Sequence, residues 1–326
     1  MTRKPNIRAR AAAAALFCVV APAPLLAQQP TTAVLDPGPT GVRIAQPGVF
    51  GNYFPARGEG PHPGILLLGG SEGGLGPATL QTALALQDEG FSVLQLAYFG
   101  VPGTADSLER IPLEIFDQGL DWLGAQTGVD PNRLAVVGAS KGAEAALLVA
   151  TRRTDLRAVV AGMPSSVVWK GVNWARGGQS TFASWTANGV ELPTMPYSAW
   201  NREEGIISVY RSVQDSSLRE DAAQAAIPIE RARAPILLIC GQSETVWPAC
   251  PMSENLATRS QEQGGPPVVI LGYGDAGHFV FGPPISSESS FYSQLGMFGG
   301  SAAGNASARE DSWPRAVDFL RENTAR

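Results

Sequence analysis

A strand, a sharp turn and a helix follow one another around residue 140, and this pattern constrains the fold more than any other feature. Residues 134–137 form a short apolar run, residues 138–142 read Gly-Ala-Ser-Lys-Gly, and residues 143–150 have a helix-forming composition. Glycines two residues before and after a serine leave room for a strained turn that lifts the hydroxyl to the helix N-terminus. The pattern predicts Ser140 as an exposed nucleophile, and the alternative is a glycine-rich turn that only packs.

The first 27 residues have the pattern of a secretory signal peptide. Residues 2–10 contain four Lys and Arg and no acidic residue, and residues 11–27 are apolar but interrupted by prolines. Such a segment suits a cleaved signal better than a membrane-spanning helix. We therefore expect export to the periplasm or the outside of the cell, with cleavage near residue 27 and no stable membrane anchor.

Removal of the signal would leave an acidic chain of 299 residues, with 20 Lys and Arg against 29 Asp and Glu and a net charge of −9. A chain with this balance and no basic run is not expected to bind nucleic acid, since that binding depends on neutralising phosphates. Its length suits one large core. We expect a polar leader over residues 28–40 and a catalytic domain over residues 41–326.

Apolar runs typical of strands alternate with helical patterns along most of this domain. The alternation predicts crossover helices and a mostly parallel, doubly wound α/β sheet. Three uninterrupted apolar runs, at residues 65–68, 236–239 and 268–271, are typical of strands buried on both faces. The expected strands cover residues 41–45, 49–54, 64–68, 91–97, 134–137, 156–161, 236–239 and 268–271, with helices over residues 113–123 and from residue 140.

The alternation lapses between residues 163 and 230. Four of the seven tryptophans lie there, among them Trp169, Trp174 and Trp185, and a helix is expected over residues 206–226. A long insertion after a core strand is commonly a functional lid or cap, in which these three tryptophans would bind substrate. The alternative is a satellite subdomain packed through its own aromatic side chains.

Only two histidines are present to act as a base for Ser140. His62 lies in a turn before a strand, where a surface role is expected, whereas His278 follows the last predicted strand on a loop that can reach over the sheet. A triad needs a carboxylate that orients the histidine, and in folds of this kind the acid lies between serine and histidine in the chain. Glu244 fits this position, and Asp275 is the competing candidate.

Two backbone amides are expected to bind the oxyanion that develops during acyl transfer. One is the amide of Lys141, and the other is the amide of Ser71 in the glycine-rich stretch at residues 69–74. Lys141 and Glu144 lie three residues apart on the predicted helix and are expected to pair with each other. No cluster of residues has metal-ligand spacing, so we expect neither a metal nor a cofactor.

Two cysteines, Cys240 and Cys250, remain after removal of the signal. An oxidising compartment would let them pair as a disulfide. The alternative is two unpaired thiols.

Residues 138–144, Gly-Ala-Ser-Lys-Gly-Ala-Glu, resemble the nucleophile motif of the bile acid-CoA:amino acid N-acyltransferase and acyl-CoA thioester hydrolase C-terminal domain family, within the α/β-hydrolase superfamily. Similar stretches at residues 111–117, 247–248, 276–279 and 311–313 extend the resemblance over roughly residues 40 to 322. It implies an α/β-hydrolase fold and a triad of Ser140, Glu244 and His278, with glutamate where the family usually has aspartate.

These observations together predict a serine hydrolase that cleaves a small-molecule ester or thioester through an acyl-enzyme. An acyltransferase that uses an amine acceptor in place of water is one alternative. A non-catalytic binding protein on a hydrolase scaffold is another, because a fold does not by itself specify a function.

Overall fold

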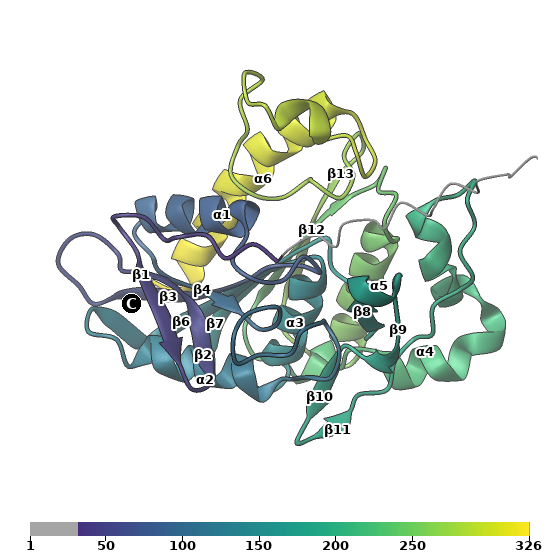
Figure 1. The fold of residues 1–326 in the computed structure, drawn as a ribbon, viewed down its shortest axis with the longest axis horizontal. Helices are drawn as coiled ribbons and strands as arrows, with labels where there is room; N and C mark the ends of the chain where they lie inside the picture. The colour runs from purple at the N-terminus through teal and green to yellow at the C-terminus, as the bar shows by residue number, and fades with distance from the viewer. Residues whose placement is uncertain (1–31, 326) are drawn as a thin grey trace, which may run out of the picture. The chain divides into compact units, whose positions relative to one another are not determined.

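An eight-stranded sheet organises residues 32–325, the part of the chain that this computed structural model describes (Figure 1). Its first strand pairs antiparallel with the second, the second pairs antiparallel with β4, and every other neighbouring pair is parallel. In spatial order the strands are β1 (Val42–Gln46), β2 (Val49–Phe54), β4 (Ser92–Ala97), β3 (His62–Leu68), β6 (Val129–Ala139), β7 (Leu156–Gly162), β12 (Ile236–Gly241) and β13 (Val268–Tyr273). The predicted mostly parallel, doubly wound sheet is confirmed.

Helices cover both faces of the sheet, as crossover connections between parallel strands require. α1 (Pro77–Asp88) and α6 (Ala302–Asn323) lie on one face, and α2 (Glu114–Gly124) and α3 (Lys141–Ala150) lie on the other (Figure 1). α5 (Ala249–Glu262) connects β12 to β13. Alternate residues of each central strand point into the two apolar cores, so these strands are apolar without interruption, as predicted.

The prediction that residues 268–271 are buried on both faces is wrong. β13 is the last strand of the sheet; Leu271 is buried, but Val268 and Ile270 are only partly buried and Val269 is 46% exposed. A short apolar run bounded by turn residues predicts a strand, but the place of that strand in the sheet depends on the other strands. The sequence pattern therefore could not separate this edge strand from a central one.

The insertion between β7 and β12 contains short strands and turns. β8 (Lys170–Asn173) pairs with β9 (Gly178–Ala183), while β10 (Trp185–Ala187) pairs with β11 (Val190–Glu191) and with β5 (Ile111–Pro112). The single helix expected over residues 206–226 is divided into η2 (Ile206–Gln214), η3 (Ser216–Leu218) and α4 (Arg219–Ala225). Asp215 causes the break: its backbone is extended and its side chain accepts a hydrogen bond from the Ser217 amide, which starts a new turn.

The predicted signal peptide over residues 1–27 lies outside the described residues. Within residues 32–325, no helix combines the length and the apolar character that a membrane-spanning segment needs.

Candidate active site

The turn between β6 and α3 has the strained geometry that the sequence predicted. Ser140 has φ 56° and ψ −122°, a backbone conformation that side-chain-bearing residues rarely adopt. A Cβ on Gly138 would lie 2.1 Å from the Gly142 carbonyl oxygen, and a Cβ on Gly142 would lie 2.2 Å from the Gly69 carbonyl oxygen. Both flanking glycines are therefore required by close backbone contacts, and the turn places the serine at the carboxyl edge of the sheet.

Three loops at this edge bring the predicted triad residues together. The Oγ of Ser140 lies 3.0 Å from Nε2 of His278, and Nδ1 of His278 lies 2.5 Å from Oε1 of Glu244. The three residues follow β6, β13 and β12 respectively, and because parallel strands end at the same edge, their loops meet. With the Nδ1 proton donated to the glutamate, Nε2 is left to accept the serine proton.

Asp275, the competing acid, bonds through its side chain to Ser301, and within residues 32–325 it forms no hydrogen bond with His278. Its Oδ1 accepts a hydrogen bond of 3.0 Å from the Ser301 amide, and its Oδ2 accepts one of 2.6 Å from the Ser301 hydroxyl. Ser301 is the N-cap of α6, so Asp275 joins its own loop to the start of that helix. The structure thus brings Glu244, and not Asp275, to the histidine.

The glycine-rich stretch after β3 passes beside the nucleophile, as predicted for an oxyanion loop. A Cβ built on Gly70 would lie 3.2 Å from the Ser140 Cβ. Among residues 32–325, neither the Ser71 amide nor the Lys141 amide donates to a protein acceptor. The role of both amides in binding an oxyanion stays a prediction.

Comparison with known proteins identifies the family of this chain. The family model for the BAAT / acyl-CoA thioester hydrolase C terminal matches residues 111–326, about two thirds of the chain. The chain belongs to this family.

Several known proteins are similar to this chain over most of its length. Acyl-coenzyme A thioesterase 6 of Mus musculus is 26% identical over 88% of this chain and 66% of its own length, and bile acid-CoA:amino acid N-acyltransferase of Mus musculus is 25% identical over the same shares. The chain spans just under two thirds of the length of these relatives.

Among solved structures, an esterase of Pyrobaculum calidifontis gives a TM-score of 0.55 at 14% identity, over 90% of this chain and 87% of its own. An acylaminoacyl peptidase of Pyrococcus horikoshii gives a TM-score of 0.54 at 16% identity, over 83% and 39%. These structures support the α/β-hydrolase fold.

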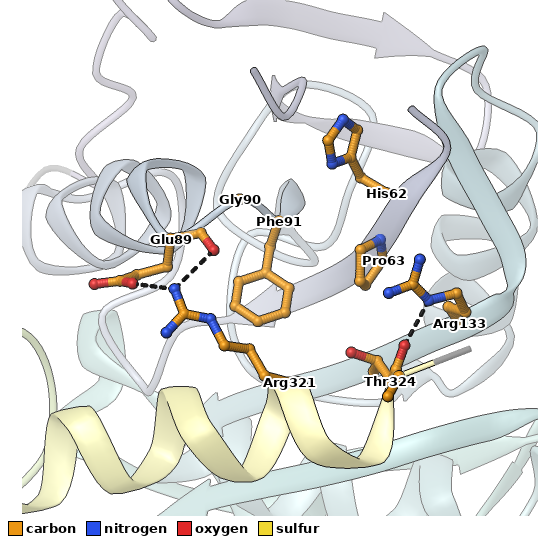
Figure 2. A pocket seen from close by; sticks show the side chains of 9 residues that line it. His62, Pro63, Glu89, Gly90, Phe91, Arg133, Arg321 and Thr324 are labelled. Carbon is orange, nitrogen blue, oxygen red and sulfur yellow. Dashed lines mark hydrogen bonds and ion pairs between the residues drawn. The ribbon is translucent and has the colours of Figure 1, made fainter. Parts of the chain in front are cut away.

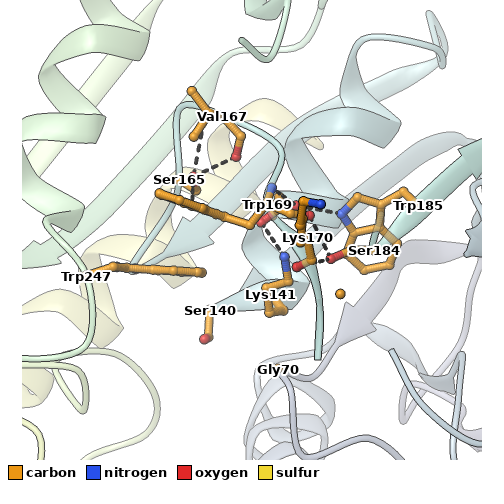
Figure 3. A network of polar contacts seen from close by, with 12 residues as sticks. Gly70, Ser140, Lys141, Ser165, Val167, Trp169, Lys170, Ser184, Trp185 and Trp247 are labelled. Atoms are coloured by element: carbon orange, nitrogen blue, oxygen red, sulfur yellow. Dashed lines mark hydrogen bonds and ion pairs between the residues drawn. The ribbon is translucent and has the colours of Figure 1, made fainter. Parts of the chain in front are cut away.

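The predicted pairing of Lys141 with Glu144 is confirmed, and the pair is buried. Nζ of Lys141 lies 2.8 Å from Oε2 of Glu144, and the side chains are 2% and 0% exposed. The other glutamate oxygen accepts hydrogen bonds from the Trp169 amide (3.1 Å) and the Trp185 indole (2.7 Å). Figure 3 shows Lys141, Trp169 and Trp185 gathered beside Ser140. Burial raises the pKa of Glu144 and lowers that of Lys141, and each charge partly offsets the shift of the other.

Two of the three tryptophans predicted to bind substrate do not line an accessible surface. Trp169 and Trp185 are completely buried, and their polar groups are bonded within the protein: the Trp169 indole donates to Ser165, and the Trp185 indole donates to Glu144. They pack the insertion onto the domain, which corrects the prediction and favours the alternative of aromatic packing. Trp174 is 51% exposed, and its role in substrate binding stays a prediction.

His62 lies at the amino end of β3, at the opposite edge of the sheet from Ser140. It lines a surface pocket with Arg133 and Arg321, where Arg321 binds Glu89 (Figure 2). The structure therefore leaves His278 as the histidine beside the nucleophile. Within residues 32–325, no group of three or more His, Cys, Asp or Glu side chains is arranged to hold a metal ion.

Cys240 and Cys250 form a disulfide, so the pairing alternative is confirmed over two free thiols. Cys240 lies near the end of β12 and Cys250 near the start of α5, on either side of the loop that carries Glu244. The bridge ties the two ends of this acid loop together.

Several residues that support the site were not predicted. Three buried side chains of α6 hold the backbone of the loop that carries His278: those of Asn305, Arg309 and Ser312. Asn305 accepts a hydrogen bond from the amide of residue 277. Arg309 donates to the carbonyls of residues 279, 281 and 283, and Ser312 donates to the carbonyl of residue 280. Burial lowers the pKa of Arg309 to about 10. No sequence signal identifies such residues, because their partners lie about 30 positions away. Tyr98 could have been found, since it directly follows a buried strand at the edge where active sites form.

Proposed function

We propose that this chain is a serine hydrolase that cleaves an ester or thioester through Ser140, His278 and Glu244. One observation carries the proposal: a serine on a strained turn lies 3.0 Å from a histidine whose other ring nitrogen lies 2.5 Å from a buried carboxylate. A serine hydroxyl is a weak nucleophile unless a base takes its proton and a third group orients that base. All three parts are in place here.

In the proposed reaction, Oγ of Ser140 attacks the acyl carbon while its proton moves to Nε2 of His278. The new C–O bond leaves the negative charge on the former carbonyl oxygen, which the amides of Lys141 and Ser71 would bind. Collapse of this intermediate breaks the bond to the leaving oxygen or sulfur, which takes the proton from His278. Water then adds to the acyl-enzyme, gives a proton to His278, and the acid departs as that proton returns to Oγ.

The family suggests which leaving groups the substrate can have. Relatives that match most of this chain are named acyl-coenzyme A thioesterases, which supports a thioester as one substrate class. The solved esterase with the same fold supports an oxygen ester only through its architecture. We propose a small-molecule acyl ester or thioester, with the acyl group bonded to Ser140 in both cases.

Transfer to an amine acceptor is the second candidate. It is favoured by the 25% identity to bile acid-CoA:amino acid N-acyltransferase of Mus musculus. The two reactions share the acyl-enzyme and differ only in whether water or an amine resolves it. Product analysis in the presence of glycine separates them.

We also propose that the protein is exported, to the periplasm or the medium. The pattern of residues 1–27 and the Cys240–Cys250 disulfide both support this, since disulfides persist in oxidising compartments. Amino-terminal sequencing of the protein recovered from periplasm and medium tests it. Recovery of the uncleaved chain from the cytoplasm would contradict it.

The experiment that tests the function compares p-nitrophenyl esters with acyl-CoA thioesters of matched chain length. We expect hydrolysis of at least one class by the wild-type protein and none above background by Ser140→Ala, because the remaining groups supply only residual catalysis. Labelling of the wild type by a fluorophosphonate probe, which Ser140→Ala should abolish, gives an independent readout. An unlabelled protein without activity on either class would instead support the binding-protein alternative.

A further inference from the structure

The insertion reaches the oxyanion loop at one point. Nε1 of Trp174, in η1 (Trp174–Arg176), donates a hydrogen bond of 2.9 Å to the carbonyl oxygen of Ser71. The two residues are 103 positions apart in the chain. Trp174 is 51% exposed, so this contact is not a by-product of complete burial in a core.

The Trp174 ring also packs against the backbone of its own turn, at Gly178. A Cβ built on Gly178 would lie 3.3 Å from the indole, so the ring packs closely against the backbone there. Gly178 has φ +95° and Gly177 has φ +86°, conformations in which a side chain is strained. The turn that carries the indole therefore packs against one side of the ring, while the N–H group on the ring donates to Ser71.

The strand that leads to Trp174 is anchored to the nucleophile helix at its other end. β8 is preceded by Trp169, whose amide donates to the buried carboxylate of Glu144 on α3. Along β8, Val172 exchanges two backbone hydrogen bonds with Leu108, of 3.0 and 3.1 Å. The segment from Trp169 to Trp174 thus connects the helix that follows Ser140 to the loop beside it.

Tyr98 holds the same loop from the side of the sheet. Its hydroxyl lies 2.6 Å from the Gly69 carbonyl oxygen and 3.1 Å from the Gly70 carbonyl oxygen. Burial, together with the negative charges of Glu72 and Glu144, raises the pKa of Tyr98 well above its usual value, so the hydroxyl stays a donor. The peptide planes on either side of the Ser71 Cα are therefore each contacted by an aromatic donor: Gly70–Ser71 by Tyr98, and Ser71–Glu72 by Trp174.

We propose that Trp174 is a positioning residue. It holds the Ser71–Glu72 peptide while Tyr98 holds the Gly70–Ser71 peptide, and by restricting rotation at Ser71 it helps to fix the Ser71 amide as a donor to the oxyanion. This inference rests on the proposed function. It assigns the insertion a part in stabilising the transition state, and it differs from the prediction that Trp174 contacts the acyl group. A positioning role changes kcat, whereas contact with an acyl chain changes KM in a manner that depends on chain length.

The test uses Trp174→Phe, which keeps an aromatic ring and removes the N–H donor together with the five-membered part of the indole. The matched control is Trp200→Phe, because Trp200 is an exposed tryptophan of the same insertion (57% against 51%). Both variants and the wild type are assayed on p-nitrophenyl esters of increasing acyl length, with thermal melting to confirm folding. The rate of labelling by a fluorophosphonate with a short alkyl group on phosphorus is measured beside them, since its phosphonyl oxygen would enter the oxyanion position without a long acyl chain.

We expect Trp174→Phe to lower kcat and the labelling rate by on the order of tenfold, the rate equivalent of one neutral hydrogen bond. KM should stay within about twofold at every chain length, and Trp200→Phe should match the wild type. An unchanged kcat and labelling rate would overturn the inference, and so would a rise in KM that grows with chain length. Ser140→Ala distinguishes the failures: if it remains active, the proposed function fails, and if it is inactive while Trp174→Phe is normal, only the positioning role fails.

Discussion

Two buried glutamates lie at the carboxyl edge of the central sheet, and they differ in how their carboxylate oxygens are bonded. Glu144 lies under the insertion, where both of its oxygens accept hydrogen bonds, from Lys141 and from two tryptophans. Glu244 lies on the acid loop, where Oε1 binds His278 and Oε2 is buried without a partner among residues 32–325. A carboxylate whose acceptors are all used by fixed donors holds the structure together, whereas one directed at a histidine can orient a base. The comparison predicts that Glu144 matters mainly for stability and Glu244 mainly for rate.

The largest expected effect is on rate, at Glu244. Glu244→Gln should lower kcat by about three to four orders of magnitude, because an amide no longer fixes the histidine tautomer that accepts the serine proton. We expect little change in the melting temperature relative to that loss. Purified protein assayed on one activated ester, with circular dichroism to confirm folding, checks both parts. A nearly normal kcat would remove Glu244 from the triad.

The corresponding change at Glu144 should act on stability. Glu144→Gln leaves Lys141 buried beside a neutral partner, and breaking a buried ion pair in this way costs about 3–5 kcal/mol of unfolding free energy. Removing both charges, in Lys141→Met with Glu144→Gln, should recover much of that loss. Urea denaturation of the three proteins measures it. If the single variant is as stable as the wild type but has lost its activity as severely as Glu244→Gln, the contrast between the two glutamates is wrong.

The disulfide should contribute less than the buried ion pair. Closing the loop of about ten residues between Cys240 and Cys250 contributes roughly 3 kcal/mol on the chain-entropy model. Cys240→Ser with Cys250→Ser is expected to lose about this much stability. Thiol titration of the unreduced, denatured protein should detect no free thiol at these positions, and two reactive thiols there would show that the bridge does not form.

The smallest effect is expected at Asp275. Asp275→Asn keeps one acceptor for Ser301 and loses the charge that joins the loop to α6. We expect kcat to fall by no more than about tenfold, through looser placement of His278. Should this variant be the inactive one while Glu244→Gln stays active, the acid has been assigned to the wrong loop.

The local parts of the site could be predicted from the sequence because their causes are local. The glycines around Ser140 are adjacent to it in the chain, and the need for them follows from backbone contacts that any such turn makes. The strands and their parallel order followed from apolar runs and helical spacing. The triad then depended only on which loops follow which strands.

The remaining parts depend on contacts between distant segments. The sequence favours Glu244 over Asp275 by its position after a strand, but it does not show what Asp275 binds instead, which is Ser301, 26 residues away. Trp169 and Trp185 were predicted to bind substrate because they lie in an insertion. Both are buried, and Glu144, 25 and 41 residues earlier, accepts hydrogen bonds from the Trp169 backbone amide and the Trp185 indole. Tryptophan content shows that a segment packs or binds, and only the fold decides which.

The most direct test of Ser140 as the nucleophile is to locate the covalent intermediate. The protein is exposed briefly to a fluorophosphonate or an activated ester, quenched in acid, and analysed by intact mass and peptide mapping. We expect a single adduct on the peptide that contains Ser140, absent in Ser140→Ala and formed far more slowly in Glu244→Gln. An adduct on another residue, or turnover by Ser140→Ala at a rate close to that of the wild type, would contradict this assignment.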